Sequence, residues 1–130
     1  MAKYLIFRND RIGDFLITAI LIRSIKRNDK KSHITVVASH KNYKYIKSFE
    51  SIDRVILFDK NFLNLIKIIK YLRSFFFDYL IVHDNKKRSL FISRFLRYKK
   101  KIKVDKKKTH IKNISNILKK LNYRLNETDL

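Results

Sequence analysis

The sequence predicts an α/β domain built on a doubly wound parallel sheet, and three observations support that prediction. Short apolar runs alternate with longer amphipathic stretches along the 130 residues. The short runs are apolar throughout, which is typical of parallel strands buried on both faces. With 45% hydrophobic residues the chain can bury a core despite a formal net charge of +21. Right-handed crossovers then place helices on both faces, which gives a Rossmann-like sheet of about five strands.

Each element follows from its own pattern. Compact apolar runs predict four strands and a weaker fifth, at residues 4–7, 34–38, 55–58, 79–82 and 102–104. Amphipathic spacing predicts five helices, at residues 14–27, 42–49, 61–75, 86–96 and 111–121. The predicted domain therefore covers residues 1–122, and residues 123–130 resemble the start of a linker to a second domain.

Composition excludes several kinds of site. The chain has no cysteine, which removes disulfides, thiolate metal sites and cysteine nucleophiles. Its one glycine, Gly13, excludes both the GxGxxG fingerprint and the phosphate loop, since each needs at least two glycines. The four histidines are widely scattered, so no metal site is predicted.

The positive charge would attract polyanions such as nucleic acid, anionic lipid headgroups or phosphorylated glycans. A/T-rich codons also favour lysine, so the charge alone does not choose among these partners. No recognised nucleic-acid-binding motif is present, which makes nucleic acid the less favoured partner. The longest apolar run, at residues 15–22, is short for a membrane helix, and no signal peptide is evident. We therefore expect a cytoplasmic protein, with possible contact to a membrane surface.

Two polar segments directly follow apolar strands, at residues 8–14 and 83–89. If the first and fourth strands are neighbours, both segments face one crevice at the carboxyl ends of the strands, where ligands bind in doubly wound sheets. His83 ends the predicted fourth strand. It could be a site residue or a buried, hydrogen-bonded histidine, and we favour the second interpretation. Arg88 and Ser89 open the following helix, where a basic side chain could hold a phosphate or carboxylate.

Gly13 and Asp14 stand between the first strand and the first helix. Glycine at this point would allow a tight turn or close approach of a ligand to the backbone. Asp14 has two interpretations: an ordinary cap that suits the helix dipole, or an ionised carboxylate acting as a general base. Spacing alone leaves both open and favours the cap.

Residues 10–18, DRIGDFLIT, followed by LIRSIK at residues 21–26, resemble the N-terminal half of family 9 glycosyltransferases, the heptosyltransferase-like group. The aspartate at position 53 and the arginine and serine at positions 88 and 89 fit the same pattern. This resemblance implies one Rossmann-like half of a GT-B architecture, the half that binds the acceptor, typically a lipopolysaccharide core or related glycan. It implies inverting transfer from a nucleotide sugar, with Asp14 as the catalytic base.

The acceptor-binding residues predicted beside this base are Arg11, Gly13, Asp84, Asn85, Arg88 and Ser89. The donor would bind a second domain, because family members run to well over twice this length. No metal or other cofactor is expected in this domain, and the chain alone is expected to be inactive. Two alternatives stay open: a small basic nucleic-acid-binding protein, and a non-catalytic remnant or interaction module.

Overall fold

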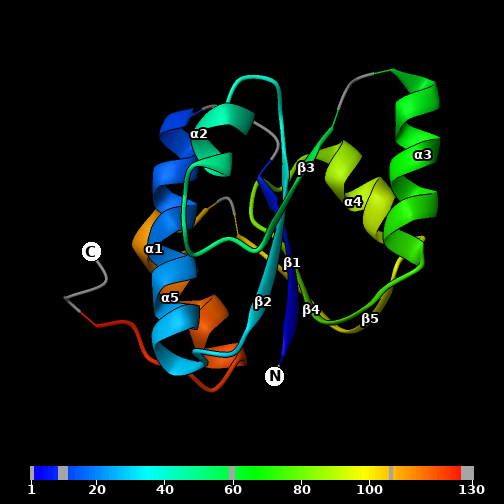
Figure 1. Ribbon diagram of the computed structural model, residues 1–130. Helices are drawn as coiled ribbons and strands as arrows, with labels where there is room; N and C mark the ends of the chain where they lie inside the picture. Colours follow the sequence, from blue (N-terminus) through cyan, green and yellow to red (C-terminus); the bar gives the residue numbers. More distant parts are fainter. Residues whose placement is uncertain (1, 9–11, 59–60, 106, 127–130) are drawn as a thin grey trace.

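A five-stranded sheet with the order β3-β2-β1-β4-β5 forms the centre of the molecule (Figure 1). This computed structural model describes residues 2–8, 12–58, 61–105 and 107–126. Its strands are β1 (Lys3–Arg8), β2 (His33–Ala38), β3 (Arg54–Leu57), β4 (Phe76–Val82) and β5 (Arg97–Lys103). All four neighbouring pairs are parallel. The order reverses direction beside β1, so β1 and β4 flank the switch point of a doubly wound sheet.

Helices cover both faces of this sheet (Figure 1). One face carries α1 (Ile12–Asn28), α2 (Tyr43–Lys47) and α5 (His110–Lys120), and the other carries α3 (Phe62–Arg73) and α4 (Lys87–Ser93). The predicted fold class is confirmed. Every predicted element is present, with boundaries that differ by a few residues.

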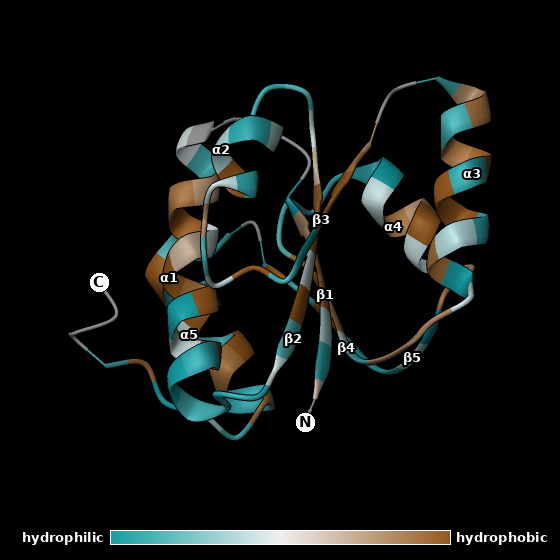
Figure 2. Ribbon diagram, viewed as in Figure 1, coloured by the Kyte–Doolittle hydropathy of each residue, from teal (hydrophilic) through white to brown (hydrophobic). Residues whose placement is uncertain are grey.

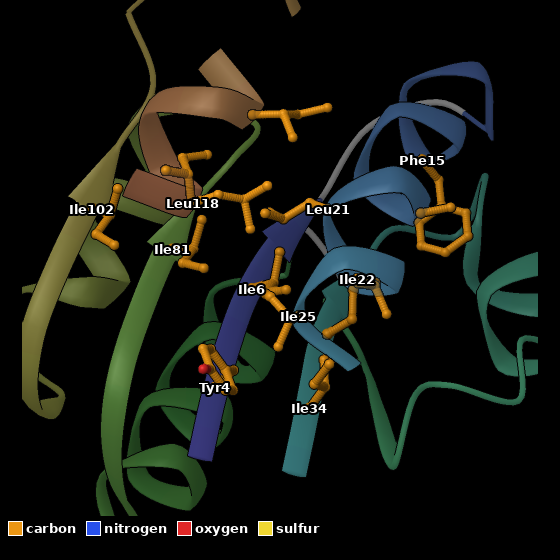
Figure 3. Close-up of a cluster of buried hydrophobic side chains, with 14 of the residues drawn as sticks. Tyr4, Ile6, Phe15, Leu21, Ile22, Ile25, Ile34, Ile81, Ile102 and Leu118 are labelled. Atoms are coloured by element: carbon orange, nitrogen blue, oxygen red, sulfur yellow. The ribbon is translucent and has the colours of Figure 1, made fainter. Parts of the chain in front are cut away.

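The side chains of β1 alternate between the two cores, as the period of a strand requires. Tyr4 and Ile6 join the cluster beneath α1 and α5 that Figure 3 shows, while Leu5 and Phe7 join the cluster beneath α3 and α4. All four side chains are fully buried. Hydropathy colouring shows apolar residues along the central strands and a mixture of apolar and polar residues on the helices (Figure 2). Burial on both faces explains why this strand reads as an uninterrupted apolar run.

The predicted boundaries are wrong around β5. The strand begins at Arg97, five residues before the predicted start, and α4 ends at Ser93 instead of residue 96. Lysines dominate β5, and they obscure its strand character in the sequence. Pairing with β4 forms the strand nonetheless, because an edge position leaves lysine side chains in water and charge there discourages further pairing.

Asp53 fixes the start of β3 to the start of β2. Its carboxylate accepts a hydrogen bond from the Ile34 amide (2.8 Å) and one from the Lys26 ammonium (3.1 Å). Burial opposes ionisation of Asp53, but these hydrogen bonds and the charge of Lys26 outweigh it and lower the pKa of the carboxyl. The aspartate that contributed to the family resemblance therefore has a structural role here.

The first residues of the predicted linker pack against the domain. The Tyr123 amide donates to the Leu118 carbonyl (2.7 Å), and its phenol lies 3.1 Å from the Tyr4 hydroxyl. The Arg124 carbonyl accepts from Arg27 (2.7 Å), and Leu125 packs against the α1-side core. These residues thus extend the packed surface beyond position 122.

Candidate functional site

A polar crevice of about 240 Å³ opens at the carboxyl ends of β1, β4 and β5. Its lining comes from the end of β1, the start of α1, the segment after β4, the segment after β5 and the start of α5. The lining residues are Arg8, Asp14, His83, Asp84, Asn85, Val104, Lys108, His110 and Asn113. Within the described residues, the two polar segments therefore meet in one crevice, as the sequence predicted.

Strand register brings these segments together. Phe7 is paired with Val82, and the Asp84 amide continues the ladder by donating to the Phe7 carbonyl (3.1 Å). Arg8 and His83 each come one position after this pair, so their side chains turn to the opposite face of the sheet, toward α1. The buried Asn42 amide donates to the Arg8 carbonyl (2.9 Å) and anchors the end of β1 to the segment that precedes α2.

A buried hydrogen-bond network forms the floor of the crevice. Arg8 Nε donates to Thr18 Oγ1 (2.7 Å), and Thr18 Oγ1 lies 2.7 Å from His83 Nδ1. All three side chains are buried. Since the hydroxyl accepts from the arginine, its own proton is available for His83, whose Nδ1 then acts as an acceptor. This arrangement favours neutral histidine with its proton on Nε2.

The electrostatics of His83 agree with that assignment. Burial, followed by the charges of Arg8 and His110, lowers the pKa of His83 to about 3. A positive guanidinium is thus held beside a neutral imidazole in the lining of the crevice. The interpretation of His83 as a buried, hydrogen-bonded histidine is confirmed, and it also lines the crevice.

Asp14 lies in the first turn of α1, two residues after the helix begins. Thr18 lies four positions further on and therefore shares its helix face. In the described part of the chain no group hydrogen-bonds the Asp14 carboxylate, and Asp14 is one of the residues that line the crevice. Asp14 is thus placed in the first turn and not at the N-cap position.

The backbone conformation of Gly13 does not itself require a glycine. Gly13 is the second residue of α1, and no described glycine has a positive φ. Outside its immediate chain neighbours and its own helix backbone, a Cβ added there would meet no atom of the described residues within 4 Å. Neither a tight turn nor packing requires glycine at this position. The open space beside the backbone is compatible with the other predicted role, close approach of a ligand.

The second polar segment divides into crevice residues and structural ones. Asp84 Oδ2 accepts from the Ser89 hydroxyl (2.7 Å) and Oδ1 from the Lys86 amide (3.2 Å), so this carboxylate stabilises the start of α4. Ser89 is buried and does not line the crevice, and Arg88 is exposed on α4 outside it. Asn85 lines the crevice with a positive φ of 51°, which asparagine tolerates.

Of the acceptor-binding residues predicted from sequence, the structure brings Asp84 and Asn85 to the crevice beside Asp14. Arg11 lies outside the described residues. The binding roles of all six residues stay predictions.

Sequence reasoning missed the contribution of α5. Lys108, His110 and Asn113 enter the crevice because β5 delivers the chain beside β4. Asn113 fixes that loop by donating to the Asp105 carbonyl (2.9 Å) and accepting from the Asp105 amide (3.0 Å). The available sequence signal was Asn113, four positions after the helix cap Thr109. Only the strand order shows that this part of α5 lies at the crevice.

The described residues contain no cluster of three or more metal-ligating side chains. None of their helices combines the length and apolar character needed to cross a bilayer.

The architecture is that of one half of a GT-B glycosyltransferase, since the solved structures that share it are GT-B enzymes and the chain spans about half their length. No protein-family model matches the sequence, and the comparison with curated proteins gives no match.

Two solved structures illustrate the similarity. The family 9 glycosyl transferase from Veillonella parvula is 16% identical with a TM-score of 0.79, over 98% of this chain and 42% of that one. The E. coli heptosyltransferase WaaC with ADP is 13% identical, also with a TM-score of 0.79, over 96% of this chain and 49% of that one. The fold that the sequence resemblance implied is confirmed.

Proposed function

We propose that this chain is the acceptor-side domain of an inverting glycosyltransferase of the family 9 type. The observation that supports it best is the position of Asp14, whose carboxylate lines a crevice at the switch point beside the buried Arg8. The proposed acceptor is an anionic glycan, in the class of a lipopolysaccharide core or lipid-linked envelope glycan. Arg8, Lys108 and the start of α5 supply positive charge for its phosphate groups.

In the proposed reaction Asp14 takes the proton of the acceptor hydroxyl. The freed oxygen attacks the anomeric carbon of a nucleotide sugar from the side opposite to the diphosphate. The new glycosidic bond forms as the bond to the diphosphate oxygen breaks, and the nucleoside diphosphate leaves. Donor binding is assigned to a C-terminal partner domain, without a metal or cofactor in this one.

The test joins this chain to the donor-side domain of a family 9 glycosyltransferase and measures sugar transfer to a phosphorylated glycan acceptor. Asp14→Asn keeps the size of the side chain but removes the base, so turnover should fall by about 100-fold or more. Asp29→Asn is the matched control, because Asp29 accepts from the Ala2 amide at the opposite end of the sheet. Retained turnover in Asp14→Asn would reduce Asp14 to a residue that stabilises the start of α1.

A further inference from the structure

Exposed apolar side chains gather on one side of the molecule. Ten large apolar residues are exposed in the described chain, and six of them belong to α3, α4 and the turn after α4: Phe62, Leu63, Ile66, Tyr71, Phe91 and Phe95. Scattered exposed apolar residues are ordinary, but a concentration on one layer indicates a surface that contacts something.

The start of α3 is the centre of this concentration. Phe62, Leu63 and Ile66 are 69%, 66% and 47% exposed, within the first five residues of the helix. Phe62 and Ile66 are one turn apart and lie on one stripe, with Leu63 beside them. Asn61 caps the helix by accepting from the Leu63 amide (2.9 Å), so the apolar turn is well formed. No folding requirement explains three large apolar side chains left in water.

Positive charge continues the same helix surface. Lys67, Lys70 and Arg73 are exposed on the second half of α3, and Lys70 and Arg73 extend the stripe of Phe62 and Ile66. Residues 61–77 and 85–104 contain no aspartate or glutamate. We call the six residues Phe62, Leu63, Ile66, Lys67, Lys70 and Arg73 the α3 patch. Its natural partner is anionic and offers an apolar interior.

We propose that the α3 patch docks the protein on the surface of an anionic phospholipid bilayer. The apolar turn enters the boundary between headgroups and acyl chains, and the basic residues contact lipid phosphates, as in interfacial amphipathic helices. A nucleic acid would match the charge but would offer no apolar interior for Leu63 and Ile66. Charge complementarity and apolar exposure together therefore favour a lipid surface.

Docking by this patch would set the orientation of the crevice. Helix α3 begins after the carboxyl end of β3, at the end of the sheet where the crevice opens (Figure 1). A bilayer that holds the start of α3 would lie beside the crevice and present lipid-linked glycans to it. This consequence rests on the proposed function, whereas the docking itself does not.

The experiment is sedimentation of the 130-residue chain with vesicles of phosphatidylglycerol or of phosphatidylcholine, without donor or acceptor. The chain should bind the anionic vesicles and bind the neutral ones far more weakly. The variant Phe62→Ser/Leu63→Ser/Ile66→Ser should lower binding to phosphatidylglycerol at least about tenfold. Its matched control is Tyr45→Ser/Ile111→Ser, which removes exposed apolar side chains from other helices and should bind like the parent.

A second pair of variants separates the α3 patch from general charge. Lys67→Gln/Lys70→Gln should weaken binding more than Lys99→Gln/Lys103→Gln, which removes the same charge from β5. Equal binding by the parent and the triple serine variant would overturn the proposal and indicate adsorption by charge alone. A parent dimer that the triple variant converts to monomer would overturn it in favour of a second copy. Competition by an oligonucleotide without dependence on the serine substitutions would overturn it in favour of nucleic acid. Turnover in the Asp14 experiment affects none of these outcomes.

Discussion

The two faces of the sheet are covered very differently. On one face α1 buries Phe15, Leu21, Ile22 and Ile25 completely. On the other face α3 buries only Ile68 and Leu72 among its described residues, and its outer surface is apolar and basic. The α1 face therefore supplies the larger buried core and the polar crevice, and the α3 face leaves apolar side chains exposed to a partner. A site that needs fixed geometry belongs on the first face, and a docking surface belongs on the second.

The largest expected effect comes from replacing one isoleucine on each face of the sheet with alanine. Ile22→Ala should lower the free energy of unfolding by about 2–5 kcal/mol, because it opens a cavity in a packed core. Ile66→Ala should change it by no more than about 0.5 kcal/mol, because that residue is about half exposed to water on the surface of α3. Urea unfolding followed by circular dichroism gives both values. Similar losses for the two variants would show that the faces are equally packed.

A smaller effect should come from the buried His83. In the unfolded chain its pKa is near 6.5, whereas in the folded protein it is about 3. Below pH 6.5 the unfolded state therefore binds more protons than the folded state. The free energy of unfolding should then decrease as the pH is lowered, by up to about 1.4 kcal/mol per pH unit. The measurement is the unfolding free energy between pH 7 and about pH 5.5, above the range in which ordinary carboxyls titrate.

His83→Gln removes the titrating group and should flatten that part of the profile. A parent profile that is already flat in this range would mean that water reaches His83 and that the floor of the crevice is not dry.

The smallest expected effect is an increase in the free energy of unfolding. Gly13→Ala fills open space in the first turn of α1, so we expect about 0.5–1 kcal/mol of added stability from reduced freedom of the unfolded chain. Thermal unfolding measures it. If the same variant loses turnover in the joined enzyme, the glycine serves close approach of a ligand. A loss of stability would contradict the open space described at this position.

The sequence was most informative where burial is complete. Strands such as β1 are apolar on both faces, so their composition alone distinguishes them from surface segments. β5 was only partly predicted because its lysines carry no strand signal, and its strand character comes from pairing with β4. Local propensity cannot report a contact between segments far apart in the sequence.

The candidate site was predictable to the extent that it follows the ends of strands. Arg8 and His83 were placed in the right segments, because residues after neighbouring parallel strands must meet. Their link through Thr18 was not foreseen, since it depends on which face of α1 turns inward. Ser89 was predicted in the right segment but does not line the crevice. Its hydroxyl donates a hydrogen bond to the Asp84 carboxylate instead.

The lysines of β5 give the sheet a defined end. Exposed ammonium groups at positions 99, 100 and 103 line the strand that would otherwise accept a sixth neighbour. A second copy approaching edge to edge would meet its own charge and be repelled at the separation that strand pairing requires. The lysines that obscured this strand in the sequence thus have a physical consequence: their repulsion opposes pairing of β5 with the sheet of a second copy.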